Sequence, residues 1–238
     1  MSSLIEIEKS DGVCVLTLNR PDALNAFNQE LWVAAADALT DAAEDDSVKC
    51  AVITGAGRAF TAGQDVAELS NPETFRNQVP GYEIFIPVAE AFPKPLIAAV
   101  NGLGVGIGMT LLMHCDMVYI STDAKLKVPF ITLGVTTEAA ASLLMPQIMG
   151  WQRASEVLYT EPWLSAQDAV DSGLALKAVA PEDLMPTAME TANHIGTLPL
   201  GPVTSTKKLL VEARIDAIQA ARKRETREFA HLVKAMTS

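Results

Sequence analysis

Two glycine-rich stretches contain the residues of this chain whose types and spacing best suit chemistry. The first covers residues 55–65, and the second covers residues 100–116, with glycines at 102, 104, 106 and 108. Each stretch follows a short apolar run that predicts a buried strand, and each leads into a predicted helix. The start of a helix presents unpaired N–H groups and the positive end of the helix dipole. These stretches therefore predict a site for an anion, which either arrives bound or forms during a reaction.

The glycine spacing argues against a nucleotide site. A G-x-G-x-x-G motif would need glycine at Ile107 or Met109, and the chain contains no G-x-x-x-x-G-K-[ST] motif. Two interpretations stay open. The glycines allow a helix to pack closely on the sheet, or one N–H group from each stretch converges on a single oxygen to form an oxyanion hole.

Both stretches resemble the signature loops of the crotonase (enoyl-CoA hydratase/isomerase) superfamily. The matching patterns are VITGxGxAFxAGxD over residues 52–65 and KPxxxxVNGxxxGxGxxxxxxCD over residues 94–116. Further matches are NRPxALNA over 19–26, Leu133-Gly134, Pro146, Gly150, and SAxxAxxxGL over 165–174. Together they cover the chain from about residue 4 to residue 235 in the expected order.

The resemblance implies an α/β fold, a ClpP-like spiral of ββα units followed by a C-terminal helical region. It implies a core with a coenzyme A thioester site over residues 1–198, and helices for trimerisation and ligand cover over residues 199–238. The family usually continues into a further helix, so we expect a more open pocket or one covered by a neighbouring subunit. The expected assembly is a homotrimer or a dimer of trimers.

The resemblance also implies the site residues. The oxyanion hole would use the backbone N–H groups of Gln64 and Ile107, where Ile107 replaces the glycine usual in the family. A β-branched residue there restricts φ and narrows the acyl site. The implied substrate-binding positions are Leu24, Ala26, Phe60, Ala62, Gly63, Asp65, Gly106, Thr110, Phe130 and Gly134.

The reaction depends on the carboxylates around the thioester. Hydratases of the family carry two glutamates, at positions that here hold Thr110 and Phe130. Glu138 remains, in a segment similar to Δ3,Δ2-enoyl-CoA isomerases of the peroxisomal type, whose single catalytic glutamate lies there. An apolar lining by Phe130, Leu133 and Val135 would raise the pKa of Glu138 toward neutrality.

Structural interpretations of the two acidic residues stay open beside the catalytic one. Glu138 falls in the first turn of a predicted helix, where a carboxylate offsets the dipole. Asp65 suits a cap of the helix that follows it. Three hypotheses result for the chain: a Δ3,Δ2-enoyl-CoA isomerase, another crotonase reaction such as a hydratase, hydrolase or lyase, and a non-catalytic coenzyme A-binding homologue.

The elements that must position these residues follow from hydrophobic periodicity and caps. Units of strand, turn and helix recur near residues 13–44, 48–70, 96–115 and 117–149. The predicted strands cover residues 4–9, 13–18, 48–54, 96–100, 117–122, 124–128 and 176–179. The predicted helices cover residues 28–44, 71–91, 137–149, 153–159, 165–173, 182–194, 203–212 and 216–235.

Composition limits the partners. The 238 residues carry a net charge of −11, which argues against nucleic acid as a main partner. Three cysteines inside apolar runs, a polar N-terminus and the lack of a long apolar stretch predict a cytoplasmic protein that does not span a membrane. The histidines His114, His194 and His231 lack metal-ligand spacing, so we expect no metal, and no bound cofactor beside the coenzyme A substrate.

Overall fold

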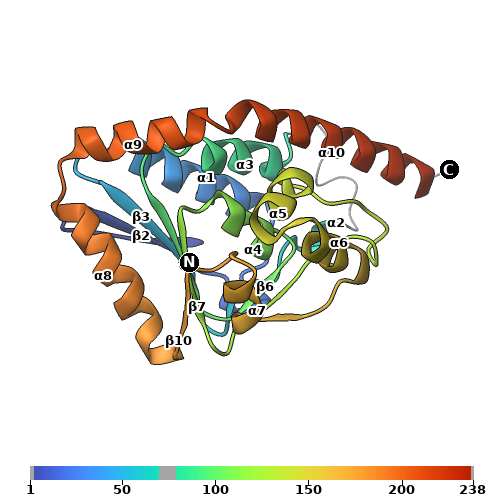
Figure 1. The fold of residues 1–238 in the computed structure, drawn as a ribbon, viewed down its shortest axis with the longest axis horizontal. Coiled ribbons are helices and arrows are strands. Elements are labelled where there is room, and N and C mark those ends of the chain that lie inside the picture. The colour runs from blue at the N-terminus through green and yellow to red at the C-terminus, as the bar shows by residue number, and fades with distance from the viewer. Residues whose placement is uncertain (1–2, 70–78, 237–238) are drawn as a thin grey trace.

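The computed structural model describes residues 3–69 and 79–236 (Figure 1). Its strands are β1 (Ile5–Ser10), β2 (Val13–Leu18), β3 (Cys50–Gly55), β4 (Ala59–Thr61), β5 (Leu96–Val100), β6 (Leu103–Val105), β7 (Met117–Ser121), β8 (Lys125–Lys127), β9 (Leu164–Ser165) and β10 (Lys177–Val179). Its α-helices are α1 (Gln29–Glu44), α2 (Val66–Leu69), α3 (Gly81–Glu90), α4 (Ile107–Thr110), α5 (Ala141–Met149), α6 (Trp151–Thr160), α7 (Ala166–Asp171), α8 (Leu184–Thr197), α9 (Leu200–Glu212) and α10 (Ile215–Met236). Short 3-10 helices are η1 (Pro21–Ala23), η3 (Leu111–His114) and η4 (Pro181–Asp183).

The strands form two sheets that the chain visits alternately. The larger sheet has the order β1-β2-β3-β5-β7-β10, and the smaller has the order β4-β6-β8-β9. The hairpin β1–β2 and the pair β8–β9 are antiparallel, and the other pairs are parallel. Each of the strand pairs β3/β4, β5/β6 and β7/β8 contributes one strand to each sheet before the chain enters a helix or connecting loop. The expected spiral of ββα units is confirmed.

The central strands β3 and β5 of the larger sheet are buried on both faces, as the continuous apolar run of β3 predicts. In β3, Ala51 and Ile53 belong to the main hydrophobic cluster with residues of α1 and α3, whereas Cys50 and Val52 face α8. Figure 1 shows α8 on one side of this sheet, with α1 and α3 on the other. Helices thus cover both faces of the sheet, and the loops that follow the parallel strands begin at the carboxyl ends of those strands.

Helix α9 begins at Leu200, three residues earlier than predicted. The proline at 202 falls in its first turn, where a helix needs no N–H donor from that residue. The predicted capped helix over 165–173 is confirmed, because Ser165 and Asp168 form a capping box at the start of α7. The predicted helix over 71–91 is described only as α3, since residues 71–78 lie outside the described ranges.

Helices α9 and α10 run one after the other along one edge of the molecule (Figure 1). Ile218 and Ala221 of α10 are fully buried and belong to the same hydrophobic cluster as the sheets. Lys207 anchors α9 through a 2.6 Å ion pair with Asp116, the residue immediately before β7. The division of the chain at residue 198 and the role of these helices in assembly stay predictions.

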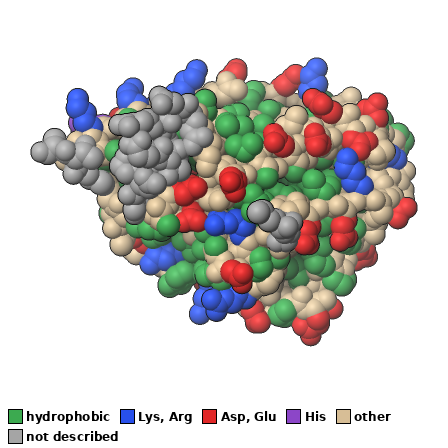
Figure 2. All heavy atoms as spheres, turned by 180° about the vertical axis from the view of Figure 1, so that it is seen from behind, with side chains coloured by type: hydrophobic (Ala, Val, Ile, Leu, Met, Phe, Trp, Pro, Cys, Tyr) green, Lys and Arg blue, Asp and Glu red, His purple; other side chains and the backbone are tan. Residues whose placement is uncertain are grey.

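Charged side chains of both signs are interspersed with hydrophobic patches on the face shown in Figure 2. Of the helices within residues 3–69 and 79–236, none has both the length and the hydropathy that crossing a bilayer requires.

Candidate active site

The two glycine-rich loops meet at one edge of the smaller sheet. Strands β4 and β6 are parallel neighbours, with Thr61 opposite Gly104, so the residues after both strands leave the sheet on the same side. A Cβ atom on Gly63 would lie 2.7 Å from the Val105 carbonyl oxygen and 3.9 Å from the Gly106 Cα. The residues preceding Gln64 and Ile107 are therefore in contact.

Close packing explains two of the glycines, and the oxyanion-hole interpretation stays a prediction for the loops that contain two others. A Cβ atom would come within 2.2 Å of the Arg58 carbonyl oxygen at Gly102, and within 2.7 Å of the Leu126 side chain at Gly104, so these glycines allow close packing. Gly63 and Gly106 instead have φ angles of +91° and +55°, which L-residues with side chains rarely adopt. These two glycines set the direction of the amides that follow them.

The amides that follow these two glycines, on Gln64 and Ile107, are the predicted donors of the oxyanion hole. The Phe27 N–H donates a hydrogen bond to the Gly63 carbonyl, and the Phe27 carbonyl accepts one from the Asp65 N–H. In this parallel bridge the N–H of Gln64, which lies between Gly63 and Asp65, points away from Phe27. Ile107 is the first residue of α4, where an N–H group has no partner within the helix. Among the described residues, neither amide donates a hydrogen bond to a protein acceptor. Two neighbouring, unpaired donors are the arrangement that stabilises an oxyanion.

Leu24 and Ala26 lie in a loop that borders this pair of amides. The Leu24 carbonyl accepts a hydrogen bond of 2.9 Å from the Ala62 N–H, which ties the loop to the end of β4. Asp65 accepts a bond of 3.1 Å from the Ala67 N–H, so its predicted role as a helix cap is confirmed. Its second oxygen pairs with Arg20 at 3.1 Å. The predicted binding positions 24, 26, 62, 63 and 65 are thus brought together.

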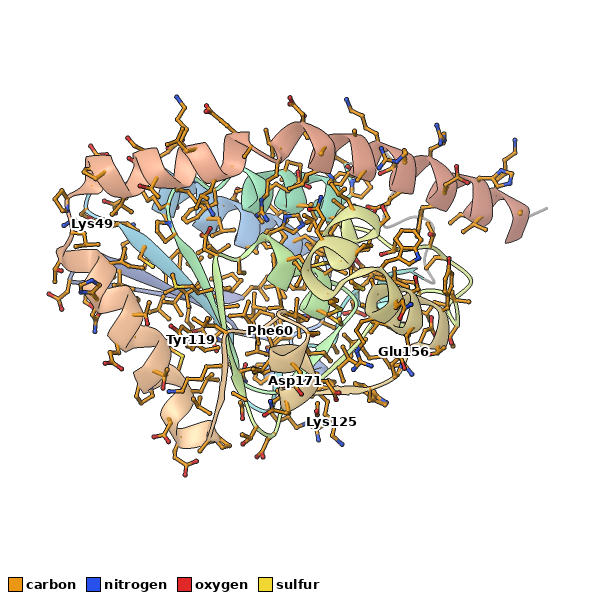
Figure 3. All side chains as sticks on the ribbon, viewed as in Figure 1. Lys49, Phe60, Tyr119, Lys125, Glu156 and Asp171 are labelled. Atoms are coloured by element: carbon orange, nitrogen blue, oxygen red, sulfur yellow. The ribbon has the colours of Figure 1, made fainter. Side chains whose placement is uncertain are left out.

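The structure shows no hydrogen bond between that loop and three other predicted binding residues, Phe60, Phe130 and Gly134, among the described residues. Phe60 of β4 is fully buried and belongs to the main hydrophobic cluster (Figure 3). Phe130 is also buried, and Gly134 closes a turn through a 2.9 Å bond from its N–H to the Ile131 carbonyl. Leu133 is 56% exposed in the single chain, and its expected contribution to the apolar lining of Glu138 stays a prediction.

Glu138 lies beside the end of α4. The Thr110 hydroxyl donates a hydrogen bond of 2.5 Å to Oε1 of Glu138. Thr110 follows Ile107 by three residues, which corresponds to about 4.5 Å along the axis of a helix. The carboxylate of Glu138 is therefore bonded to the short helix that begins at Ile107, through the residue that stands where hydratases of the family carry a glutamate.

The surroundings of Glu138 raise its pKa to about 7. Desolvation is the largest cause, and the negative charge of Glu225 acts in the same direction. Hydrogen bonds from Thr110 and Tyr82 and the positive charge of Arg222 oppose the increase. A carboxyl group whose pKa is near neutrality can both take up and return a proton at physiological pH.

The predicted helix over residues 137–149 is wrong at its start. Helix α5 begins at Ala141, and the preceding residues Ala139 and Ala140 have left-handed φ angles of +54° and +59°. Alanine favours helix locally, but contacts from distant elements override that preference here. Each left-handed alanine costs about 1–2 kcal/mol. Glu138 consequently lies before the helix, and its interpretation as a dipole-offsetting residue of the first turn is also wrong.

Three residues around this turn were missed by sequence reasoning. Tyr82 and Glu225 are remote in the chain and belong to no motif, so no local signal could have indicated them. His114 was recognised only as a buried helical residue. Its Nε2 lies 2.8 Å from the Ala139 carbonyl oxygen, and burial lowers its pKa to about 4, so the ring is neutral and donates from Nε2.

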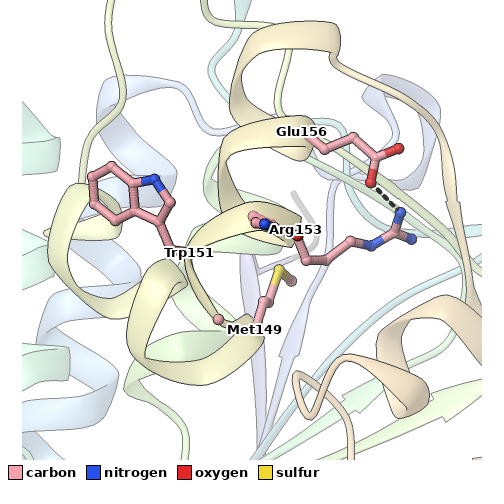
Figure 4. Close-up of a pocket in the computed structure, with 6 residues that line it drawn as sticks. Met149, Trp151, Arg153 and Glu156 are labelled. Carbon is pink, nitrogen blue, oxygen red and sulfur yellow. Dashed lines mark hydrogen bonds and ion pairs between the residues drawn. The ribbon is translucent and has the colours of Figure 1, made fainter.

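Two hollows lie elsewhere on the surface. One of about 720 Å³ is lined by residues of α5 and α6, including Trp151, Arg153 and Glu156 (Figure 4). The other, of about 470 Å³, lies between β7 and α8. Neither includes Glu138 or the paired amides, and the 2.7 Å ion pair between Arg153 and Glu156 already satisfies the main charges of the first. Within the described ranges, the acidic, histidine and cysteine side chains form no group of three suited to a metal.

Comparisons with known proteins agree with this geometry. Residues 8–237 match the family described as enoyl-CoA hydratase/isomerase. The 1,2-epoxyphenylacetyl-CoA isomerase of Escherichia coli is 35% identical over 82% of this chain and 76% of its own length. The crotonyl-CoA hydratase of Syntrophomonas wolfei is 35% identical over 80% of this chain and 75% of its own. The crystal structure of an enoyl-CoA hydratase/isomerase from Pseudoalteromonas atlantica superposes with a TM-score of 0.94 at 32% identity, covering 97% of this chain and 92% of the other.

Proposed function

This chain belongs to the enoyl-CoA hydratase/isomerase family, and we propose that it is a Δ3,Δ2-enoyl-CoA isomerase with Glu138 as its proton shuttle. The observation that carries the proposal is the position of one carboxylate, bonded to Thr110 and one helical turn from the Ile107 amide. Its pKa of about 7 suits reversible proton transfer. The substrate is a coenzyme A thioester with a double bond between C3 and C4, and no resident cofactor is needed.

In the proposed reaction the thioester carbonyl oxygen accepts hydrogen bonds from the Gln64 and Ile107 amides. The Glu138 carboxylate takes a proton from C2, and the electron pair of that C–H bond moves toward the thioester oxygen, forming a dienolate. The two amides stabilise the negative charge that develops there. The protonated Glu138 then returns the proton to C4, which leaves the double bond between C2 and C3. One group carries the proton both ways, so no second acid or base is required.

Thr110 and Phe130 favour isomerisation over hydration. Adding water across a double bond needs one group to activate the water and another to deliver a proton, and neither position supplies a carboxylate. Thr110 instead donates a hydrogen bond to Glu138, which places a hydroxyl group where hydratases of the family carry a glutamate. The likeness to a crotonyl-CoA hydratase supports a second candidate, in which Glu138 activates water and the product is a 3-hydroxyacyl-CoA.

A direct assay separates these functions. The purified protein is incubated with a 3-enoyl-CoA, and 2-enoyl-CoA, 3-hydroxyacyl-CoA and free coenzyme A are measured. Glu138→Gln should lower 2-enoyl-CoA formation at least about 100-fold, the usual contribution of a general base. The control is Glu156→Gln, which removes an exposed carboxylate of α6 and should leave turnover unchanged.

Each other outcome has a clear meaning. Undiminished isomerisation by Glu138→Gln would refute the proposed shuttle. Predominant 3-hydroxyacyl-CoA would favour the hydratase, and free coenzyme A would favour a hydrolase. Thioester binding without exchange of C2 hydrogens into heavy water would indicate a non-catalytic binding protein.

Assembly as a homotrimer or a dimer of trimers is part of the same proposal. Leu209 and Leu210 of α9 are 69% and 60% exposed in the single chain, and burying such apolar side chains against a neighbouring subunit would stabilise an oligomer.

A further inference from the structure

Residues from distant parts of the chain hold the left-handed turn that follows Glu138. Ala139 and Ala140 lie in a conformation that alanine seldom adopts, and helix α5, which starts immediately afterwards, has no side-chain cap of its own from its N-cap residue. Such a turn persists only where its surroundings fix it. Because it directly follows Glu138, its conformation determines where that carboxylate points.

Three elements hold the turn through its backbone. From α3, the Tyr82 hydroxyl accepts a hydrogen bond of 3.0 Å from the Ala139 N–H. From η3, His114 donates to the Ala139 carbonyl. From α10, Glu225 accepts a bond of 2.7 Å from the Ala140 N–H at one oxygen and a bond of 2.8 Å from the Ser142 N–H at the other.

Glu225 differs from the other two holding residues in its charge and in its distance along the chain. Its side chain is only 6% exposed, and both of its oxygens are used by the amides at the start of α5. A negative charge at this end of a helix is favourable, so Glu225 acts as the cap that α5 lacks locally. A serine or asparagine beside the turn could satisfy such amides without burying a charge.

Accordingly, we propose that Glu225 of the C-terminal helix α10 is a positioning residue for Glu138. By holding the Ala139–Ala140 turn, Glu225 fixes the orientation of the Glu138 carboxylate. The inference rests on the proposed function, in which Glu138 is the base. Glu225 acts through the backbone and is not itself a catalytic residue.

The charges near Glu138 allow the two effects of Glu225 to be separated. The groups that influence Glu138 are Glu225 and Arg222 from α10, Tyr82 from α3 and Thr110 from α4. Arg222 is paired with Glu90 at 2.7 Å and Glu83 at 3.4 Å, so it does not neutralise Glu225 by an ion pair. Glu225 therefore contributes both geometry and a negative charge.

The first test is Glu225→Gln, in which one amide oxygen remains and the charge is lost. We expect kcat to fall about tenfold with KM nearly unchanged, because the substrate site is intact and the base is misdirected. The acidic limb of the pH–rate profile should move to lower pH, because a neighbouring negative charge no longer favours protonated Glu138. The control Glu228→Gln, an exposed carboxylate one turn along α10, should change neither quantity.

A second variant separates aim from charge. In Glu225→Gln/Ala140→Gly, glycine adopts the left-handed conformation without steric cost. We expect this double variant to recover part of the lost kcat while the acidic limb stays at lower pH. A normal kcat and an unmoved acidic limb in Glu225→Gln would overturn the proposal, and so would a loss of kcat that the glycine does not relieve.

A readout without substrate keeps this inference distinguishable from the isomerase proposal. Carboxyl carbons of ¹³C-labelled glutamate are titrated by NMR, and the signal that is lost in Glu138→Gln reports Glu138. If Glu225→Gln lowers the pKa of that signal, the coupling of Glu225 to Glu138 stands even where no 3-enoyl-CoA is converted. An unchanged titration overturns it even where isomerisation is observed.

Discussion

Replacing Glu138 by glutamine should make the protein more stable above pH 7 while removing the proposed base. Glutamine has nearly the same shape and can still accept the hydrogen bond from Thr110, but it carries no charge to desolvate. The folded wild-type protein raises the pKa of Glu138 from its ordinary value of 4.5 to about 7. The ionised carboxylate is thus less favourable in the folded state than in the unfolded chain.

The size of the effect follows from the two pKa values. Below pH 4.5 the carboxyl is protonated in both states, and its protonation equilibrium costs no stability. As the pH rises from 4.5 to 7, the unfolded chain loses its proton first, and the free energy of unfolding falls by about 1.4 kcal/mol per pH unit. Above pH 7 the loss is complete and amounts to roughly 3 kcal/mol. The glutamine variant escapes this loss.

Thermal unfolding at several pH values measures the difference. At pH 8.5 the Glu138→Gln variant should unfold roughly 6–12 °C above the wild type, because 1 kcal/mol shifts the Tm of a chain of this size by about 2–4 °C. At pH 5 the advantage should shrink to less than about 1 kcal/mol. Glu156→Gln, which removes an exposed carboxylate, should show no such trend. A Glu138→Gln advantage that is absent at pH 8.5, or equal at both pH values, would refute the reasoning.

Two further substitutions test other contacts. Thr110→Val removes the donor to Glu138, so the pKa of Glu138 should rise and the acidic limb of kcat/KM should move up by about one pH unit, as expected for a hydrogen bond to a charged group. A limb that stays in place would contradict this. Lys207→Met removes the cation from Asp116, which keeps only its hydrogen bond from the Leu96 N–H. This should cost roughly 2–3 kcal/mol in urea unfolding, less than for a fully buried pair because the Asp116 side chain is 21% exposed. Lys208→Met, at an exposed neighbouring lysine, is the matched control, and equal losses in both variants would contradict the assignment.

The features that are local in the sequence could be predicted. A continuous apolar run identified β3 as a strand buried on both faces, and glycines after two such strands indicated the convergence of the Gln64 and Ile107 loops. The capping box at Ser165 and the cap at Asp65 depend on residues two or three positions apart, so their sequence signals suffice. The contact of Glu138 with Thr110, at the end of the second glycine-rich loop, could be expected only through the family resemblance.

The conformation around Glu138 could not be predicted from its own segment. Residues 137–149 are rich in alanine and read as an uninterrupted helix, yet Ala139 and Ala140 are held in a left-handed turn. The groups responsible come from α3, η3 and α10, and no pattern within the segment encodes them. Hydrogen bonds from residues far away in the chain therefore outweigh the helix propensity of Ala139 and Ala140, directly beside the proposed base.

The contact between α10 and this turn bears on how the protein is made. Ser142 and Glu225 are 83 residues apart, so a ribosome working at about 5–20 residues per second needs roughly 4–17 s to supply the residue that caps α5. During that interval the nascent chain already contains both glycine loops and Glu138 but lacks the carboxylate that holds the turn. A chain stalled before residue 225 would leave the Ala139–Ala140 turn without this support, so the proposed site takes its final form only after Glu225 has been synthesised.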